Sequence, residues 1–80
     1  MFPFSIASVD NVIFEGEVYS VTLPGSLGEL TIMKDHEPLI TTLKEGDVRI
    51  RTGRDQKDLQ VVAIRGGLLE MVHNKGIVLV

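Results

Sequence analysis

The sequence predicts an all-β domain, a small β-sandwich or flattened barrel of about eight to ten short strands. Two features indicate this fold. Apolar and polar residues alternate with period two in segments rich in β-branched residues, and Gly, Pro, Asn or Asp interrupts these segments at short intervals. No stretch keeps the helical spacing of apolar residues over enough length to predict a helix.

Turn-forming pairs separate the extended segments in the first half of the chain. Asp10-Asn11 closes the first segment, and Pro24-Gly25 ends the segment in which alternation is most regular. The charged residues 34–37, followed by Pro38, end another. The predicted strands are 3–9, 12–14, 17–23 and 28–33, while 39–43 is either a short strand or an extended link.

In the second half, alternation is clearest in the segment 47–51. Val48 and Ile50 are expected to face the core, because side chains two apart share one face of a strand. The arginines that alternate with them, Arg49 and Arg51, are expected to face water.

The segment 58–64 is apolar on both faces, as expected of a strand inside a sandwich. A polar hairpin at 52–57 precedes it. Strands at 68–72 and 77–80, joined by a turn at 73–76, complete the predicted fold. The inward-facing positions predict a core formed by Ile6, Val21, Ile32, Val48, Ile50, Val61 and Met71.

The length of the chain, 80 residues, predicts one domain, 1–80. A domain this short buries only ~60% of its unfolded surface, so its stability is marginal without help. The sequence has no cysteine, which excludes disulfides and thiolate metal sites. A permanent protein partner is the remaining source of extra stability, and this favours a subunit of a larger assembly.

The composition is that of a soluble globular chain, with 44% hydrophobic residues, 24% charged residues and a net charge of −3. This charge gives no general attraction to nucleic acid or anionic lipid. The apolar runs are far shorter than the ~20 residues needed to span a bilayer, and the start of the chain lacks the pattern of a signal peptide. We therefore expect a cytoplasmic protein without direct membrane insertion, which reaches a membrane only through a partner.

The cluster Asp35-His36-Glu37 is the only one with a catalytic character. On an extended strand its two carboxylates point to opposite faces, so they do not both reach the imidazole. His73 lies in an unrelated turn, and two histidines so far apart are weak support for a metal. The favoured interpretation is a polar turn with a half-buried histidine, and we predict no catalytic or metal-binding residue.

Two further patterns suggest ligands only superficially. The bend at 23–28 contains two glycines but lacks the Lys and Ser/Thr of a phosphate loop, so no nucleotide or other cofactor is expected. Arg49 and Arg51 lie near Arg54 and Lys57, but nucleic-acid binders add exposed aromatic residues and net positive charge. A solvated sheet face is the favoured interpretation.

Lys34 suggests an alternative of another class. Domains that carry biotin or lipoate are also β-rich, have about this length and present one lysine on a hairpin tip. Biotin carriers place Met on both sides of that lysine, whereas here Met33 precedes it and Asp35 follows it. The two-fold sequence symmetry of such domains is also missing.

Five landmarks occur in an order and spacing that cover nearly the whole chain. They are VIFEGEV at 12–18, PGSLGELTI at 24–32, HEPLI at 36–40, LKEGDVRI at 43–50 and GGLLEM at 66–71. Together they resemble the N-terminal domain of the epsilon subunits of F-type ATP synthases. The resemblance implies a ten-stranded β-sandwich at the foot of the central stalk, between the gamma subunit and the membrane ring of c subunits.

The resemblance also implies contact residues. Glu29, with Ser26 and Leu27, corresponds to the bend that faces the c ring. The surface toward gamma corresponds to Ser8, His36 and Thr41. The family often has Pro-Gly just before the histidine, whereas Lys34-Asp35 stands here and adds charge to that turn.

The role implied by the resemblance is mechanical. The subunit couples hydrogen ion transport to ATP synthesis as part of the rotor, without catalysis of its own, at the cytoplasmic face of the inner or plasma membrane. Many members continue into two C-terminal helices that can brake ATP hydrolysis, and in some these helices bind ATP. Because the last predicted strand is 77–80, we expect a short form that neither inhibits by extension nor senses ATP.

Overall fold

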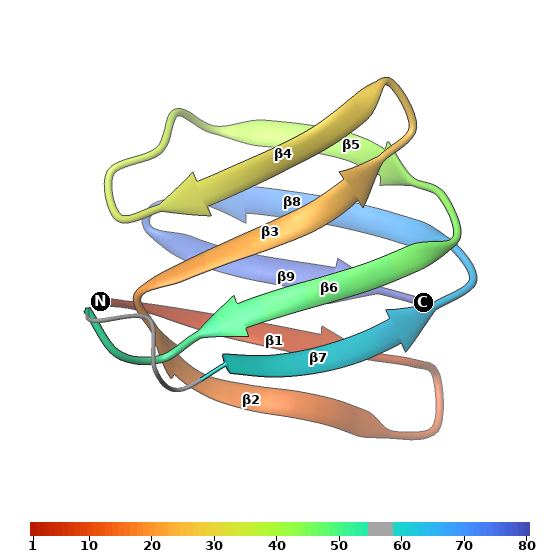
Figure 1. Cartoon of the computed structure of the whole chain (residues 1–80), viewed down its shortest axis with the longest axis horizontal. Helices are drawn as coiled ribbons and strands as arrows, with labels where there is room; N and C mark the ends of the chain where they lie inside the picture. Colours follow the sequence, from red (N-terminus) through yellow and green to blue (C-terminus); the bar gives the residue numbers. More distant parts are fainter. Residues whose placement is uncertain (55–58) are drawn as a thin grey trace.

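The computed structural model describes residues 1–54 and 59–80, and all of its regular elements are strands (Figure 1). The all-β prediction is confirmed, with nine strands in the described residues, whereas the resemblance implies ten. The strands are β1 (Phe2–Ala7), β2 (Val12–Val18), β3 (Ser20–Gly25), β4 (Gly28–Met33), β5 (Leu39–Leu43), β6 (Gly46–Arg51), β7 (Leu59–Ile64), β8 (Gly67–Val72) and β9 (Lys75–Leu79).

The strands form one curled sheet in the order β2-β1-β9-β8-β5-β3-β6-β7, with β4 added on β3. The curl produces two layers that face one another, β2-β1-β9-β8-β5 and β7-β6-β3-β4 (Figure 1). The layers are joined where β3 meets β5 through a single pair, Gly25 and Leu43. All pairings are antiparallel except that of β1 with β9, the first and last strands.

The core lies between the two layers and is built by alternate residues of the strands. In β6, Val48 and Ile50 are fully buried, which confirms their predicted inward orientation. The predicted core residues Ile6, Val21, Ile32 and Met71 are fully buried as well. In the described part of the chain, the buried apolar residues are Phe2, Phe4, Ile6, Val18, Val21, Leu23, Ile32, Leu43, Val48, Ile50, Ile64, Leu69, Met71 and Val78.

The prediction for the segment 58–64 is wrong. Its described part is β7, an edge strand that pairs with β6 alone, and Val61 is 52% exposed rather than part of the core. Val62 and Ile64 face the core instead. The segment is apolar on both faces, so its pattern does not distinguish the buried face from the exposed one. The predicted hairpin at 52–57 lies largely outside the described residues.

The predicted strand 17–23 is two strands. β2 extends to Val18 and β3 begins at Ser20, and the Tyr19 N–H between them donates to the Arg51 carbonyl at 2.7 Å. The chain passes from one layer to the other at Tyr19, so the inward-facing positions change phase there. The alternative left open for 39–43 is decided in favour of a strand, since β5 pairs with β8 along its whole length.

Replacing Ile50 by alanine removes a fully buried side chain and should lower the free energy of unfolding by about 2–5 kcal/mol. The matched control is Val61→Ala on the adjacent strand, which should change this free energy by less than about 1 kcal/mol because the side chain is half exposed. The midpoint of urea unfolding, followed by circular dichroism, measures both. Equal shifts in the two variants would contradict the assignment of the inward faces.

Candidate partner-binding surface

The β3–β4 hairpin ends in a tight turn made of Ser26 and Leu27. The pair that closes the turn is Gly25 with Gly28. A Cβ on Gly25 would lie 2.5 Å from the Gly28 carbonyl oxygen, and Gly28 has φ of 140°, so both positions require glycine. The glycines that suggested a phosphate loop in the sequence therefore serve the turn itself.

Hydrogen bonds to β5 hold this turn in place. The Ser26 N–H donates to the Thr42 carbonyl at 3.0 Å, and the Thr42 hydroxyl donates to the Ser26 hydroxyl at 2.9 Å. Leu27, beside this attachment, is fully exposed. An apolar side chain on a fixed turn gains free energy when a partner covers it, without much loss of conformational entropy.

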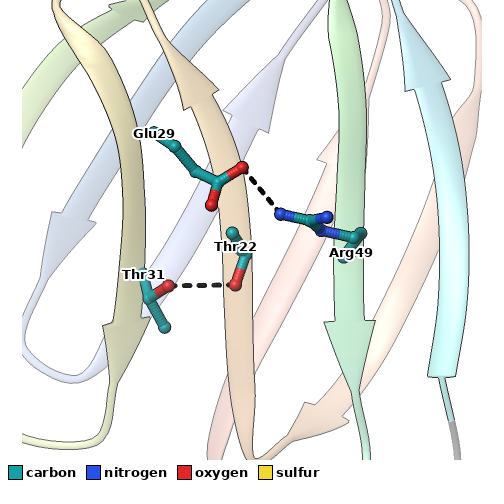
Figure 2. A network of polar contacts seen from close by, with 4 residues as sticks. All are labelled: Thr22, Glu29, Thr31 and Arg49. Atoms are coloured by element: carbon teal, nitrogen blue, oxygen red, sulfur yellow. Dashed lines mark hydrogen bonds and ion pairs between the residues drawn. The ribbon is translucent and has the colours of Figure 1, made fainter.

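Glu29, at the start of β4, forms an ion pair that crosses β3. The Arg49 Nη2 on β6 donates to Glu29 Oε2 at 2.7 Å, and next to it the hydroxyls of Thr22 and Thr31 lie 2.9 Å apart (Figure 2). The side chains of Arg49 and Glu29 are 40% and 66% exposed. The Arg49 Nε is buried and has no hydrogen-bond partner among the described residues. The predicted orientation of Arg49 toward the outer face is confirmed, but its head group is bound to the carboxylate of Glu29.

A groove of about 360 Å³ lies beside this hairpin. Its lining combines residues from both predicted contact sets, namely Leu27 and Glu29 from one and His36 and Thr41 from the other. The two sets therefore border a common depression, although they come from separate parts of the chain. The complete lining is Gly25, Leu27, Gly28, Glu29, Leu30, His36, Leu39 and Thr41.

His36 lies in the loop between β4 and β5. Its backbone N–H donates to the Met33 carbonyl at 3.2 Å, and its Nδ1 lies 2.8 Å from the Glu37 carbonyl oxygen. The ring is exposed, so the expectation of a half-buried histidine is wrong, although the polar turn is confirmed. The expectation assumed an extended strand, whereas residues 34–35 form a turn in which Asp35 has φ of 67°.

The described residues contain no group of three or more His, Asp or Glu side chains placed to hold a metal ion. The carboxylate of Asp35 accepts a hydrogen bond from Asn74 instead of contacting the imidazole of His36.

Residues 1–54 and 59–80 contain no helix with the length and apolar character needed to cross a membrane.

Ser8 is not brought together with the other predicted contact residues. It lies in the β1–β2 connection, where its N–H donates to the Asn11 carbonyl at 2.8 Å and its Oγ accepts from the Asn11 N–H at 3.2 Å. β2 is the edge of the five-stranded layer farthest from β5, so Ser8 is remote from the groove that contains His36 and Thr41 (Figure 1).

An apolar outer surface on the five-stranded layer was not found from the sequence. Ile40, Leu68 and Leu79 are exposed, and the register places them in neighbouring rows of the same face. Each stands on a strand whose alternate residues fill the core. The outer faces of these strands also carry polar residues such as Thr42 and Glu70, so the sequence pattern does not single out this apolar surface.

The chain matches a known family over its whole length. Residues 1–80 match the family described as ATP synthase, Delta/Epsilon chain, beta-sandwich domain. The ATP synthase epsilon chain of Synechocystis sp. is 39% identical over 75 residues, which are 94% of this chain and 53% of the relative. That of Delftia acidovorans is 44% identical over 69 residues, 86% of this chain and 49% of the relative. The chain thus spans about half the length of these curated relatives.

The fold is similar to chains in solved ATP synthases. A chain of the Euglena gracilis mitochondrial ATP synthase, solved with the c-ring, gives a TM-score of 0.84 at 18% identity and covers 95% of this chain and 48% of that chain. A chain of the central stalk and c-ring of the Tetrahymena thermophila mitochondrial ATP synthase gives a TM-score of 0.77 at 16% identity, with 96% and 60% covered. At these identities the likeness shows the fold alone.

The sequence left two families to compare, the ATP synthase epsilon subunits and the carrier domains modified at a lysine such as Lys34. The match over residues 1–80 favours the first and not the second. The order of landmarks, the nine-stranded sandwich and the curated relatives all agree with it. The protein therefore belongs to the delta/epsilon chain family of ATP synthases, within the β-sandwich domain of that family.

Proposed function

We propose that the protein is a non-catalytic rotor subunit of a rotary ATP synthase, which links the gamma subunit to the c ring and so couples proton transport to ATP synthesis. The observation that carries this proposal is the braced β3–β4 tip. It presents an exposed leucine, Leu27, beside an oriented carboxylate, Glu29, at the rim of a groove. Such a surface suits docking to a protein partner.

The fold suits a mechanical role. Torque passes through a subunit only if the subunit resists deformation, and a close-packed interior gives this resistance. The core fills the space between the two layers, and β3 is paired along both of its edges. A force applied at the β3–β4 tip is therefore transmitted through paired backbone to both layers.

The exposed apolar surface of the five-stranded layer supports a permanently assembled state. Ile40, Leu68 and Leu79 are exposed, and a domain of this size is expected to be only marginally stable by itself. A partner that binds the folded chain raises its stability by mass action. We infer that the protein lies peripherally at the cytoplasmic face of the membrane, held there by protein partners, with no nucleotide, other cofactor or nucleic acid of its own.

The proposed contacts divide between two partners. Ser26, Leu27 and Glu29 are assigned to the polar loops of the c ring, and Ser8, His36 and Thr41 to the gamma subunit. Glu29 and His36 are assigned to different partners but line the same groove. The two partners would then meet close to one another along the rim of this groove, while Ser8 would mark a separate point of contact with gamma.

The experiment that tests the proposal is co-purification with tagged gamma and c subunits. A rotor subunit is retained by both partners, and its mass remains that of the unmodified 80-residue chain. Retention by neither partner would overturn the proposal.

Glu29→Lys should weaken attachment to the c ring and lower proton-coupled ATP synthesis, because it reverses the charge at the proposed contact. The isolated protein should stay folded, since an exposed ion pair contributes only about 0.2–1 kcal/mol. The matched control is Arg49→Met, which removes the same ion pair but keeps the carboxylate, and should retain more ring binding. Loss of gamma binding with ring assembly intact would reverse the assignment of the two partners.

His36→Ala should lower the affinity for the gamma subunit without changing the midpoint of urea unfolding. The ring is exposed, and its hydrogen bond within the described part of the chain is to the carbonyl of the next residue. Lys34→Ala is the matched control, because Lys34 is an exposed residue of the same loop outside the groove. Calorimetric titration with gamma measures the affinity of both variants. If His36→Ala binds gamma as tightly as Lys34→Ala and the unchanged protein do, His36 is not part of the contact.

A further inference from the structure

A reciprocal pair of hydrogen bonds ties the β4–β5 loop to the β8–β9 turn. The backbone N–H of Asp35 donates to Asn74 Oδ1 at 2.6 Å. In return, Asn74 Nδ2 donates to Asp35 Oδ1 at 3.2 Å. Figure 1 shows the two connections at the same end of the molecule, although they are far apart in the sequence. We refer to these two bonds as the Asp35–Asn74 clamp.

Both residues of the clamp have a left-handed backbone. Asp35 has φ of 67° and Asn74 has φ of 58°, values that L-residues other than Asn and Asp rarely adopt. Asn and Asp tolerate this region because their short polar side chains bond to nearby backbone groups. Here the side chain of each residue bonds to the other residue instead of to its own segment. The clamp therefore stabilises two unfavourable turns at once.

The clamp lies directly beside His36 in the chain. Asp35 immediately precedes His36 in the chain, and the backbone N–H of Asp35 is one of the bonded groups. Among residues 1–54 and 59–80, the other hydrogen bonds of this loop are the local ones from His36 to Met33 and Glu37. The Asp35–Asn74 clamp is thus the described contact that fixes the loop relative to a distant part of the sandwich.

We propose that Asn74 is a positioning residue, which acts through Asp35 to hold His36 in the orientation that binds the gamma subunit; this inference rests on the proposed function. Lys34-Asp35 has neither the rigid ring of proline nor the freedom of glycine to take positive φ, and yet Asp35 has φ of 67°. The clamp supplies bonds that hold this backbone conformation. A loop that is ordered before binding loses less conformational entropy on association, and this raises affinity.

The decisive variant is Asn74→Gly. Glycine adopts the left-handed backbone of position 74 without strain, so the β8–β9 turn is kept while both hydrogen bonds of the clamp are lost. The matched control is His73→Gly in the same turn. His73 has φ of 52°, and its side chain forms no hydrogen bond among the described residues. A difference between the two variants therefore reports the clamp and not the turn.

The first measurement is amide hydrogen exchange in the free 80-residue protein, which needs no partner. The Asp35 N–H should exchange about tenfold faster or more in Asn74→Gly, because it loses its acceptor, and should keep its rate in His73→Gly. An unchanged rate in Asn74→Gly would overturn the inference at this first step.

The second measurement is the affinity for purified gamma. Asn74→Gly should weaken it by about five- to tenfold, the effect of losing one or two modest hydrogen bonds and the order they impose. Asp35→Asn should bind like the unchanged protein, since its Oδ1 still accepts and its backbone N–H still donates. A purely structural role would lower the unfolding midpoint of Asn74→Gly without this selective loss of affinity.

The outcomes separate the inference from the proposed function. If His36→Ala weakens gamma binding but Asn74→Gly does not, the positioning role is wrong and the gamma contact stands. If neither variant changes the affinity although Asp35 exchanges faster, the gamma contact itself is wrong and the positioning role toward gamma falls with it. Loss of affinity in both variants, with normal binding by Asp35→Asn, supports the inference.

Discussion

Strand β3 is paired along both edges, and the two layers of the sandwich are joined through it. β4 occupies one edge, while β5 and β6 share the other, where Gly25 pairs with Leu43 and Thr22 with Arg49. The chain bends from β5 into β6 along this shared edge, and the Lys44 N–H donates to the Pro24 carbonyl at 2.9 Å within the bend. The β3–β4 tip continues β3 directly. The exposed tip is therefore anchored in a strand that pairs with three others, β4, β5 and β6.

The candidate surface follows from this arrangement. The tip carries Leu27, the first residues of β4 carry Glu29, and Arg49 reaches the carboxylate across β3 because β6 is the next strand (Figure 2). The opposite end of β4 leads into the loop that the Asp35–Asn74 clamp holds. A single short strand therefore separates the two proposed contact regions, of which one is held by hydrogen bonds to β5 and the other by hydrogen bonds to the β8–β9 turn.

The sequence was sufficient for those parts of the fold that depend on strict alternation. Val48 and Ile50 alternate with arginines, so only one face is suitable for burial, and the structure agrees. Val61 lies in a strand that is apolar on both faces, so the sequence does not show which face is buried. The register with β6 decides this, because Val62 pairs with the buried Val48 and Val61 pairs with Arg49. The proposed contact residues came from the family resemblance, whereas no pattern in the sequence pointed to Asn74. Its partner is Asp35, and contacts between two turns so distant in sequence follow from tertiary structure.

The parallel pairing of β1 with β9 bears on the order in which the domain can form. Phe4 pairs with Gly76 and Ile6 with Val78, so the first strand completes its hydrogen bonding only when the last strand is present. The ring of Phe4 lies close to Gly76. A larger residue would not fit there, since a Cβ on Gly76 would lie 2.8 Å from the phenyl ring. Contacts of such long sequence separation make folding slow, because loop-closure entropy is lost before they form. During synthesis, the aromatic residues of β1 therefore complete their packing only after the β8–β9 hairpin has been made.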